Sequence, residues 1–372
     1  MILKNGTFDA MARDIIRNDN RIIIFGCGVI GATVVPEIVK QYGLEERVEC
    51  YIDNDSTWWG SFVSFCNRNV KIEQPGVLGR YPGKVTVLVT ISRYKSAYDQ
   101  LTGMNLSDDF SCFIIPAMCI DNFKSDGHKG VKHSTQRPVI PKRIHYMWLG
   151  GNQIPETLLK CMDSWREFCT DYEIIRWDES NYDVHKNDFV SQAYDNGKFG
   201  FVPDYARIEL LYEYGGIYLD TDVELKRNID DLLYREAFCG VEKWQVLNFG
   251  GCSGAVKGHK SLEPFLENWR KRKLIREDGT FDGISSGLID TGVAISHGYV
   301  IDGRNQTVNG MDIFGYDYFH PYDYMSGRLD ITDDTHSVHH FHGGWLDDKA
   351  RENNIKSTAQ YGELMQSAVM VY

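Results

Sequence analysis

Apolar and polar positions change their spacing sharply within residues 203–225, whose sequence is PDYARIELLYEYGGIYLDTDVEL. Up to Tyr214 the spacing is that of a helix, and Pro203 occupies its start, a favourable place for proline. After the two glycines at 215–216 the period becomes two, which predicts a strand that continues to Leu225. One face of that strand is apolar. The other carries a tyrosine and three carboxylates, which burial would not tolerate without donors or a cation to meet them.

Two aspartates of this stretch, Asp220 and Asp222, are separated by a single residue at the end of the predicted strand. Carboxylate oxygens at this spacing can hold Mg²⁺ or Mn²⁺ while leaving positions for water and for diphosphate oxygens. Asp204 and Arg207 are three residues apart and share one face of the preceding helix, and with Tyr218 they bracket the same place. The simpler interpretation is an edge strand whose acidic face is only solvated.

An apolar strand followed by Asp-x-Asp-x-Val also resembles the nucleophile strand of haloacid dehalogenase-like phosphatases, in which Asp220 would be the nucleophile. In those proteins the motif usually opens the domain. Here a helix and a pair of glycines precede it, so we favour the metal site and keep the phosphatase as an alternative.

The first part of the chain, residues 1–122, has the alternating pattern of a small α/β domain with a parallel sheet. The pattern predicts helices near 8–17 and from 31 to about 42, and strands at 21–25, 48–52, 85–92 and 113–115. The sequence GCGVIG at 26–31 stands between the first of these strands and the helix that follows it.

Three glycines of that sequence, Gly26, Gly28 and Gly31, stand where a dinucleotide-binding fold needs a tight turn, a close backbone approach and helix packing. Asp53, 22 residues after Gly31, is placed as a ribose-binding acid would be. The domain is about half of a full dinucleotide fold. It resembles the small Rossmann-like domains fused to sugar-nucleotide and capsule enzymes. A structural or oligomerising domain is the favoured interpretation, and bound NAD or another nucleotide is the alternative.

Residues 123–140 read as a linker that contains glycine, proline and several basic residues, and the second domain is expected at 141–372. The basic run extends over 124–143. Solvated charge is its simplest explanation, and a peripheral contact with anionic lipid head groups is the functional one.

Composition narrows the classes of function. A chain of 372 residues, 42% hydrophobic, suits two globular domains. The formal net charge of −12 argues against a nucleic-acid partner, because a phosphate backbone is bound by clustered Lys and Arg. We expect no transmembrane helix and no secretory signal, because there is no apolar run of 18 residues and no apolar core near the start. Nine cysteines without a C-x-x-C pair suit a reducing cytoplasm, where we expect the protein to act.

Three segments occur in the order IHYMWLGG at 144–151, PDYARIELLYEYGGIYLDTD at 203–222 and VHHFHGGW at 338–345. In these segments the chain is similar to glycosyltransferase family thirty-two, the DXD-containing sugar transferases. That family includes bacterial capsular polysaccharide transferases and relatives of the yeast initiating mannosyltransferase. The resemblance covers the whole second domain, and it implies a GT-A fold, a nucleotide-sugar donor, Mn²⁺ or Mg²⁺, and retention of anomeric configuration.

The resemblance also implies roles for the residues around the DXD motif. Asp222 matches the aspartate that binds the metal directly, and Asp220 matches its partner, which reaches the ribose, the sugar and the water shell of the metal. Tyr218 matches a tyrosine that lines the nucleotide pocket. Asp204 and Arg207 match the pair that holds the donor-sugar hydroxyls and the diphosphate.

Flanking segments supply further roles by the same resemblance. Trp148 matches a tryptophan stacked on the nucleobase, and Trp345 matches a late tryptophan at the donor site. His339 aligns with a histidine that supplies another metal or diphosphate ligand, with His340 as the alternative. Pro203 and Gly344 stand where the family often has serines. A separate zinc site built from the histidines at 336, 339, 340 and 342 is a further alternative.

The function expected from these observations is a retaining, metal-dependent glycosyltransferase. It would move a sugar from a nucleotide sugar to a glycan or lipid-linked saccharide, in capsular or surface polysaccharide synthesis. Self-association through the first domain is an additional expectation. The alternatives are an NAD-dependent oxidoreductase or epimerase that uses the first domain, and the phosphatase described above.

Overall fold

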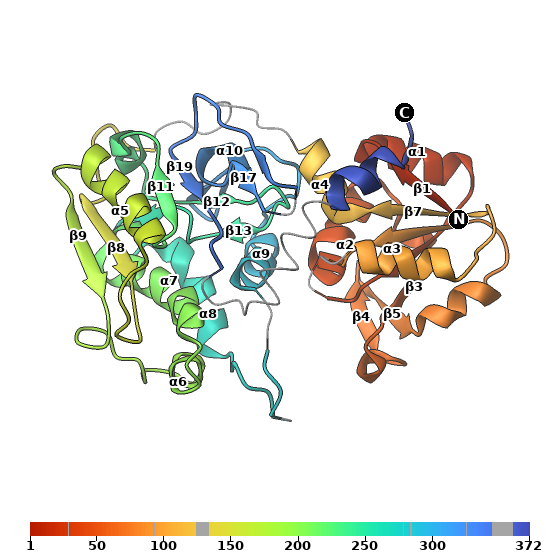
Figure 1. Ribbon diagram of the computed structural model, residues 1–372, viewed down its shortest axis with the longest axis horizontal. Helices are drawn as coiled ribbons and strands as arrows, with labels where there is room; N and C mark the ends of the chain where they lie inside the picture. The colour runs from red at the N-terminus through yellow and green to blue at the C-terminus, as the bar shows by residue number, and fades with distance from the viewer. Residues whose placement is uncertain are drawn as a thin grey trace. The chain divides into compact units, whose positions relative to one another are not determined.

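The computed structural model describes residues 1–28, 30–91, 94–123, 134–277, 279–282, 285–324, 326–343 and 360–372 (Figure 1). The chain forms two compact units, one of Met1–Lys124 with Asn353–Tyr372 and the other of Ser125–Glu352. Half of the basic run, residues 124–133, lies outside the described residues. Within the described part of that run, Lys142 forms ion pairs with Asp171 and Asp230, and Arg143 forms one with Glu173.

The first unit is built on one sheet with the strand order β20-β1-β7-β6-β2-β3-β5-β4. In that order the strands are Val369–Met370, Ile2–Asn5, Phe110–Ile114, Val85–Val89, Arg21–Phe25, Val48–Ile52, Arg68–Glu73 and Phe62–Phe65. Its helices are α1 (Phe8–Arg17), α2 (Val35–Gln41), α3 (Tyr94–Gly103) and α4 (Ile115–Asn122). Every neighbouring pair is parallel except β4 with β5. The central strands β6 and β7 are buried throughout, as expected for a parallel sheet covered on both faces.

The end of the chain belongs to this unit and not to the second domain, where the sequence had placed it. Strand β20 pairs with β1, and the backbone amide of Val371 donates to the carbonyl of Asn5 at 2.8 Å. A strand of two residues is too short to give a periodic signal, so the sequence pattern could not show this pairing.

Packing explains the first and third glycines of the motif at 26–31. Gly26 follows β2 with a φ of +110°, and a Cβ on Gly31 would lie 2.0 Å from the carbonyl oxygen of Gly26. A Cβ on Gly28 would meet no atom within 4 Å. The carboxylate of Asp53 accepts hydrogen bonds from the amide of Cys27 at 2.9 Å and from the amide of Asp55 at 2.9 Å. Asp53 therefore fastens the glycine loop to the end of β3.

This packing predicts that alanine at two of the glycines changes the stability of the first unit by different amounts. Gly31→Ala forces a methyl group against backbone and should destabilise the first unit by about 1–3 kcal/mol. Gly28→Ala enters open space and should change stability by less than about 0.5 kcal/mol. Hydrogen exchange of the β2 and β6 amides, followed by mass spectrometry, measures the effect within this unit. Equal losses in the two variants would contradict the packing role of Gly31.

The second unit has a mixed sheet with the order β15-β16-β12-β14-β10-β8-β9, and β13 pairs with β12. In that order, with β13 last, the strands are Gln306–Val308, Met311–Phe314, Ala237–Val241, Ser253–Ala255, Gly216–Tyr218, Arg143–Met147, Glu173–Trp177 and Leu247–Asn248. Two short pairs lie apart from it: β11 (Val223–Leu225) with β19 (Ser337–His339), and β17 (Tyr322–Asp323) with β18 (Arg328–Leu329). The helices are α5 (Glu156–Phe168), α6 (Asp188–Asp195), α7 (Val202–Tyr214), α8 (Glu263–Arg270), α9 (Ser286–Ser296) and α10 (Tyr316–Phe319). The α/β class is thus confirmed, and the arrangement is consistent with a GT-A type fold.

Helix α7 begins and ends within one residue of the predicted positions, and Gly215 closes it with a φ of +65°. The strand predicted after it is wrong as a single element. Strand β10 ends at Tyr218 and pairs with β8 and β14, whereas β11 begins at Val223 and pairs with β19. The period of two covered both strands, and the turn between them has no signal of its own. Tyr218, predicted to lie on a polar face, is 1% exposed.

Helix α5 holds β11 from the side opposite β19. The indole nitrogen of Trp165 donates to the carbonyl of Val223 at 2.7 Å, and the hydroxyl of Ser164 accepts from the amide of Leu225 at 2.8 Å. Trp165 is fully buried in the core of this unit. The turn at 219–222 is therefore anchored by strands at both ends. No helix among the described residues is long and apolar enough to cross a membrane.

Candidate functional site

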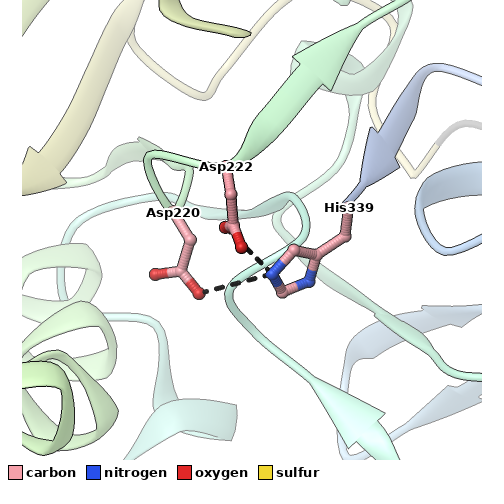
Figure 2. Close-up of side chains that lie close together, drawn as sticks. All are labelled: Asp220, Asp222 and His339. Atoms are coloured by element: carbon pink, nitrogen blue, oxygen red, sulfur yellow. Dashed lines mark ion pairs between the residues drawn. The ribbon is translucent and has the colours of Figure 1, made fainter. Parts of the chain in front are cut away.

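Three potential metal ligands meet where the turn between β10 and β11 faces the end of β19 (Figure 2). One ligand atom each from Asp220, Asp222 and His339 lies within 4.8 Å of the others. The Nε2 atom of His339 is 3.1 Å from Oδ1 of Asp222 and 4.0 Å from Oδ2 of Asp220. The antiparallel register places Val223 opposite His339, so backbone pairing brings the histidine to the aspartates.

Asp222 and His339 determine each other's charge. Burial by itself would raise the pKa of the Asp222 carboxyl, but His339 and the backbone amide of His342, 2.8 Å from Oδ2, hold that pKa well below its usual range. Burial would lower the pKa of His339, yet the two aspartates outweigh it and raise that pKa. Each member of the pair therefore favours the charged form of the other.

The donor set fits a divalent cation. Two carboxylates offer the hard oxygens that Mg²⁺ and Mn²⁺ prefer, and one imidazole adds a nitrogen, which Mg²⁺ sites seldom use. The other ring nitrogen of His339, Nδ1, is buried and has no hydrogen-bond partner among the described residues. The ring is instead stacked on Phe341, with centroids 4.2 Å apart.

A buried cation lies beside the aspartates. Arg207, on α7, is 4% exposed and forms an ion pair with Asp204 one turn earlier on the same helix. Its Nη1 atom is 3.3 Å from Oδ2 of Asp220, and its Nη2 donates to the hydroxyl of Ser286 at 3.0 Å. Burial disfavours the guanidinium charge, but the surrounding carboxylates raise the pKa of Arg207. Burial likewise raises the pKa of Asp204 to about 6, against the opposing effect of Arg207. The predicted helix pair thus reaches the turn that carries Asp220.

A glycine loop covers Asp220 on another side, and the sequence analysis missed it. The amide of Asp220 donates to the carbonyl of Gly250 at 2.8 Å, and a Cβ on Gly250 would lie 2.0 Å from the Asp220 carboxylate. The side chain of Asn248 accepts from the amides of Gly250 and Gly251 at 2.8 and 3.2 Å. The sequence LNFGG at 247–251 contains the one available signal, a glycine pair that follows an apolar segment and an asparagine.

Of the other predicted donor-site residues, Tyr218 lies next to Asp220, Trp148 is partly buried after β8, and Trp345 is not described. Tyr218 is buried next to Asp220, and burial, followed by the charge of Asp220, raises the pKa of its hydroxyl well above the usual value. Trp148 follows β8 and is partly buried, and its indole donates to the carbonyl of Asn152 at 2.7 Å. Trp345 and Gly344 lie outside the described residues.

The histidines near the end of the second unit contact different carboxylates. His339 lies in the metal-ligand cluster, whereas Nε2 of His340 is 2.9 Å from the Glu224 carboxylate. Nε2 of His336 is 2.8 Å from the carboxylate of Asp231. These partners draw the rings apart, so the described histidines do not gather into the alternative zinc site.

The match to a family model falls on this unit. Residues 155–239 match the family model described as a glycosyltransferase sugar-binding region containing DXD motif. Inositol phosphoceramide mannosyltransferase 3 of Schizosaccharomyces pombe is 36% identical over 139 residues, which cover 36% of this chain and 37% of the relative. Mannosyl phosphorylinositol ceramide synthase CSH1 of Saccharomyces cerevisiae is 28% identical over 184 residues, covering 42% and 47%. The chain thus spans less than half the length of these yeast relatives.

A solved structure, the PaToxG glycosyltransferase, aligns with 55% of this chain and 79% of its own at 12% identity and a TM-score of 0.32, a likeness too weak to carry an argument. The match to the family model includes the aspartate turn described above, and together with the yeast relatives it supports a glycosyltransferase of the DXD type.

Proposed function

We propose that the protein transfers a hexose from a nucleotide sugar to a hydroxyl group of a glycan or a lipid-linked saccharide. The observation that carries this proposal is the convergence of Asp220, Asp222 and His339 beside the buried guanidinium of Arg207. Packing alone gives no reason to gather these charges in one place, whereas a diphosphate with its cation would be bound by them. One yeast relative is named as a mannosyltransferase and the other as a mannosyl phosphorylinositol ceramide synthase, which supports mannose as the transferred sugar.

Asp220, Asp222 and His339 are the residues that would hold Mn²⁺, or Mg²⁺, in this site. Once bound, the cation supplies Lewis-acid stabilisation of the charge on the leaving diphosphate. Arg207 contributes a second positive charge that is already fixed by Asp204, Asp220 and Ser286, so no reorganisation is needed when negative charge develops nearby.

The reaction that we propose retains the anomeric configuration. The bond between the sugar C1 atom and the diphosphate oxygen breaks, and the acceptor oxygen forms the new bond to C1 on the same face. The proton of the acceptor hydroxyl passes to the departing phosphate oxygen. This route needs no nucleophilic side chain, and it leaves the carboxylates near C1 free to bind the cation and the sugar.

The names of both yeast relatives include a ceramide that carries inositol and phosphate, which supports a lipid-linked acceptor. We propose a role in capsular or surface polysaccharide synthesis and a cytoplasmic location, both of which rest on the resemblance and the composition. The family-model match falls on the second unit, and the comparisons favour neither the oxidoreductase nor the phosphatase alternative.

Removal of one ligand charge should weaken metal binding. Asp222→Asn should lower Mn²⁺ affinity by at least about tenfold, because even outer-shell partners of metal ligands have effects of that size. Water-proton relaxation during a Mn²⁺ titration measures the affinity. Glu224→Gln is the matched control, because Glu224 lies two residues further on and its carboxylate contacts Lys226 and His340 outside the cluster. Equal affinity losses in both variants, or no loss in Asp222→Asn, would contradict the assignment of the ligands.

Donor hydrolysis tests the activity directly. The purified chain is incubated with a panel of nucleotide sugars that includes GDP-mannose, with Mn²⁺ or with a chelator, and the released nucleotide is measured. We expect release from one donor that needs the metal and falls at least about 100-fold in Asp222→Asn, the loss of a transition-state interaction of about 2.7 kcal/mol. Circular dichroism checks that the variant keeps its fold. Failure of the wild-type chain to release nucleotide from any donor would overturn the proposed function.

A further inference from the structure

One carboxylate close to this site has no part in the chemistry described so far. Glu242 follows β12 and begins the turn that leads to β13. Its amide donates to the carbonyl of Val246 at 2.9 Å, and its carbonyl accepts from the amide of Gln245 at 2.8 Å. Gln245 has a φ of +65°, so the turn has a defined, tight geometry.

The turn is held in place by the elements around it. Lys243 forms an ion pair with Asp330, and the indole nitrogen of Trp244 donates to the carboxylate of Asp323 at 3.2 Å. The hydroxyl of Tyr299 donates to the carbonyl of Gln245 at 3.2 Å. Lys243, Trp244 and Gln245 are all buried, so Glu242 is presented by a fixed support and not by a mobile loop.

A short chain of hydrogen bonds leads from Glu242 to the DXD motif. Its Oε1 atom accepts from the side-chain nitrogen of Asn248 at 2.8 Å. The side-chain oxygen of Asn248 accepts from the amide of Gly250, whose carbonyl accepts from the amide of Asp220. Asn248 therefore links the carboxylate to the glycine loop that covers Asp220.

The Glu242 carboxylate lacks a cationic partner although the residue is partly buried. Among the described residues Glu242 makes no ion pair, and nothing is bonded to its Oε2 atom. Burial raises the pKa of Glu242 to about 7, against the hydrogen bond from Asn248 and the charges of His339 and Arg207. The Oε2 atom is not among the buried polar atoms that lack a partner, so it is accessible and can accept a hydrogen bond from a ligand.

The surroundings suit a sugar better than a cation. Glu242 is not among the three residues whose ligand atoms cluster within 4.8 Å. Aromatic rings continue from the same turn to the metal ligand: Trp244 to Tyr324 with centroids 5.7 Å apart, Tyr324 to Phe341 at 5.1 Å, and Phe341 to His339 at 4.2 Å. Carboxylates that accept hydroxyl hydrogen bonds beside aromatic faces are well matched to the polar edges and apolar faces of a sugar ring.

We propose that Glu242, oriented by Asn248, binds a hydroxyl group of the sugar that is transferred and so contributes to the choice of donor. This inference rests on the proposed function, because it needs a nucleotide sugar at Asp220 and Asp222. Glu242 acts here as a specificity-determining residue. It accepts a hydrogen bond from the sugar and exchanges no proton with it.

The test compares wild type with Glu242→Gln, which preserves size and can still accept from Asn248. With the donor that the wild type hydrolyses, kcat/KM should fall about 10- to 100-fold, the size expected for a hydrogen bond to a charged group. The affinity for the corresponding nucleoside diphosphate with Mn²⁺ should change less than about twofold, which also shows that the variant is folded. Glu236→Gln, at an exposed carboxylate just before β12, is the matched control and should behave as wild type.

A set of donors that each lack one sugar hydroxyl distinguishes the loss of a direct contact between Glu242 and the sugar from a general disturbance of the site. The donor without the contacted hydroxyl should lose activity with the wild type and show no further loss with Glu242→Gln, whereas the other donors should show the full loss. Equal losses with every donor, unchanged kinetics, or a parallel loss of nucleoside diphosphate affinity would each overturn the inference. If Glu242→Gln does not fold, Glu242→Asp is measured in the same way, since it keeps the charge but withdraws it from the sugar. Absence of hydrolysis by the wild type would refute the proposed function itself, a different result from unchanged kinetics in the variant.

Discussion

The pairing of β11 with β19 is the constraint on which the site depends. It sets Val223 opposite His339, and the amide of His340 donates to the carbonyl of Asp222 at 3.1 Å. A shift of one residue in this register would turn each side chain of β19 to the other face. The identity of the third ligand is therefore fixed by backbone hydrogen bonds and not by the flexibility of a side chain.

Charge balance explains why Arg207 and Asp204 lie beside the aspartate turn. Three carboxylates, those of Asp204, Asp220 and Asp222, lie beside the Arg207 guanidinium and the His339 imidazole. A buried charge is stable only with partners, so Arg207 and Asp204 hold each other, and Arg207 orients Asp220 as well. With Arg207 charged and His339 neutral, a divalent cation would balance the three carboxylate charges. The site is thus arranged so that an anionic diphosphate adds to a balanced set of charges.

Local patterns predicted much of this arrangement, and long-range pairing decided the rest. The helix from 202 to 214, the glycine pair after it and the shared face of Asp204 and Arg207 depend on spacing within a few residues, which the sequence shows. The break between β10 and β11 was missed, because both strands continue the same period while they pair with different partners. Asn248 and Glu242 were missed for a related reason. They lie in and beside a turn, and only the folded chain brings them to Asp220.

The glycine motif of the first unit and the aspartate turn of the second differ in whether packing accounts for their residues. In the first unit, packing accounts for Gly31, which lies against the Gly26 carbonyl, and hydrogen bonds to the loop and to Asp55 occupy the Asp53 carboxylate. Those features stabilise the fold whether or not a nucleotide binds, so the motif by itself says little about function. In the second unit, the gathering of Asp220, Asp222 and Arg207 costs desolvation energy that packing does not return. A motif that the fold does not need is the stronger indication of chemistry. The aspartate turn is therefore a better guide to the function of this chain than the glycine motif of the first unit.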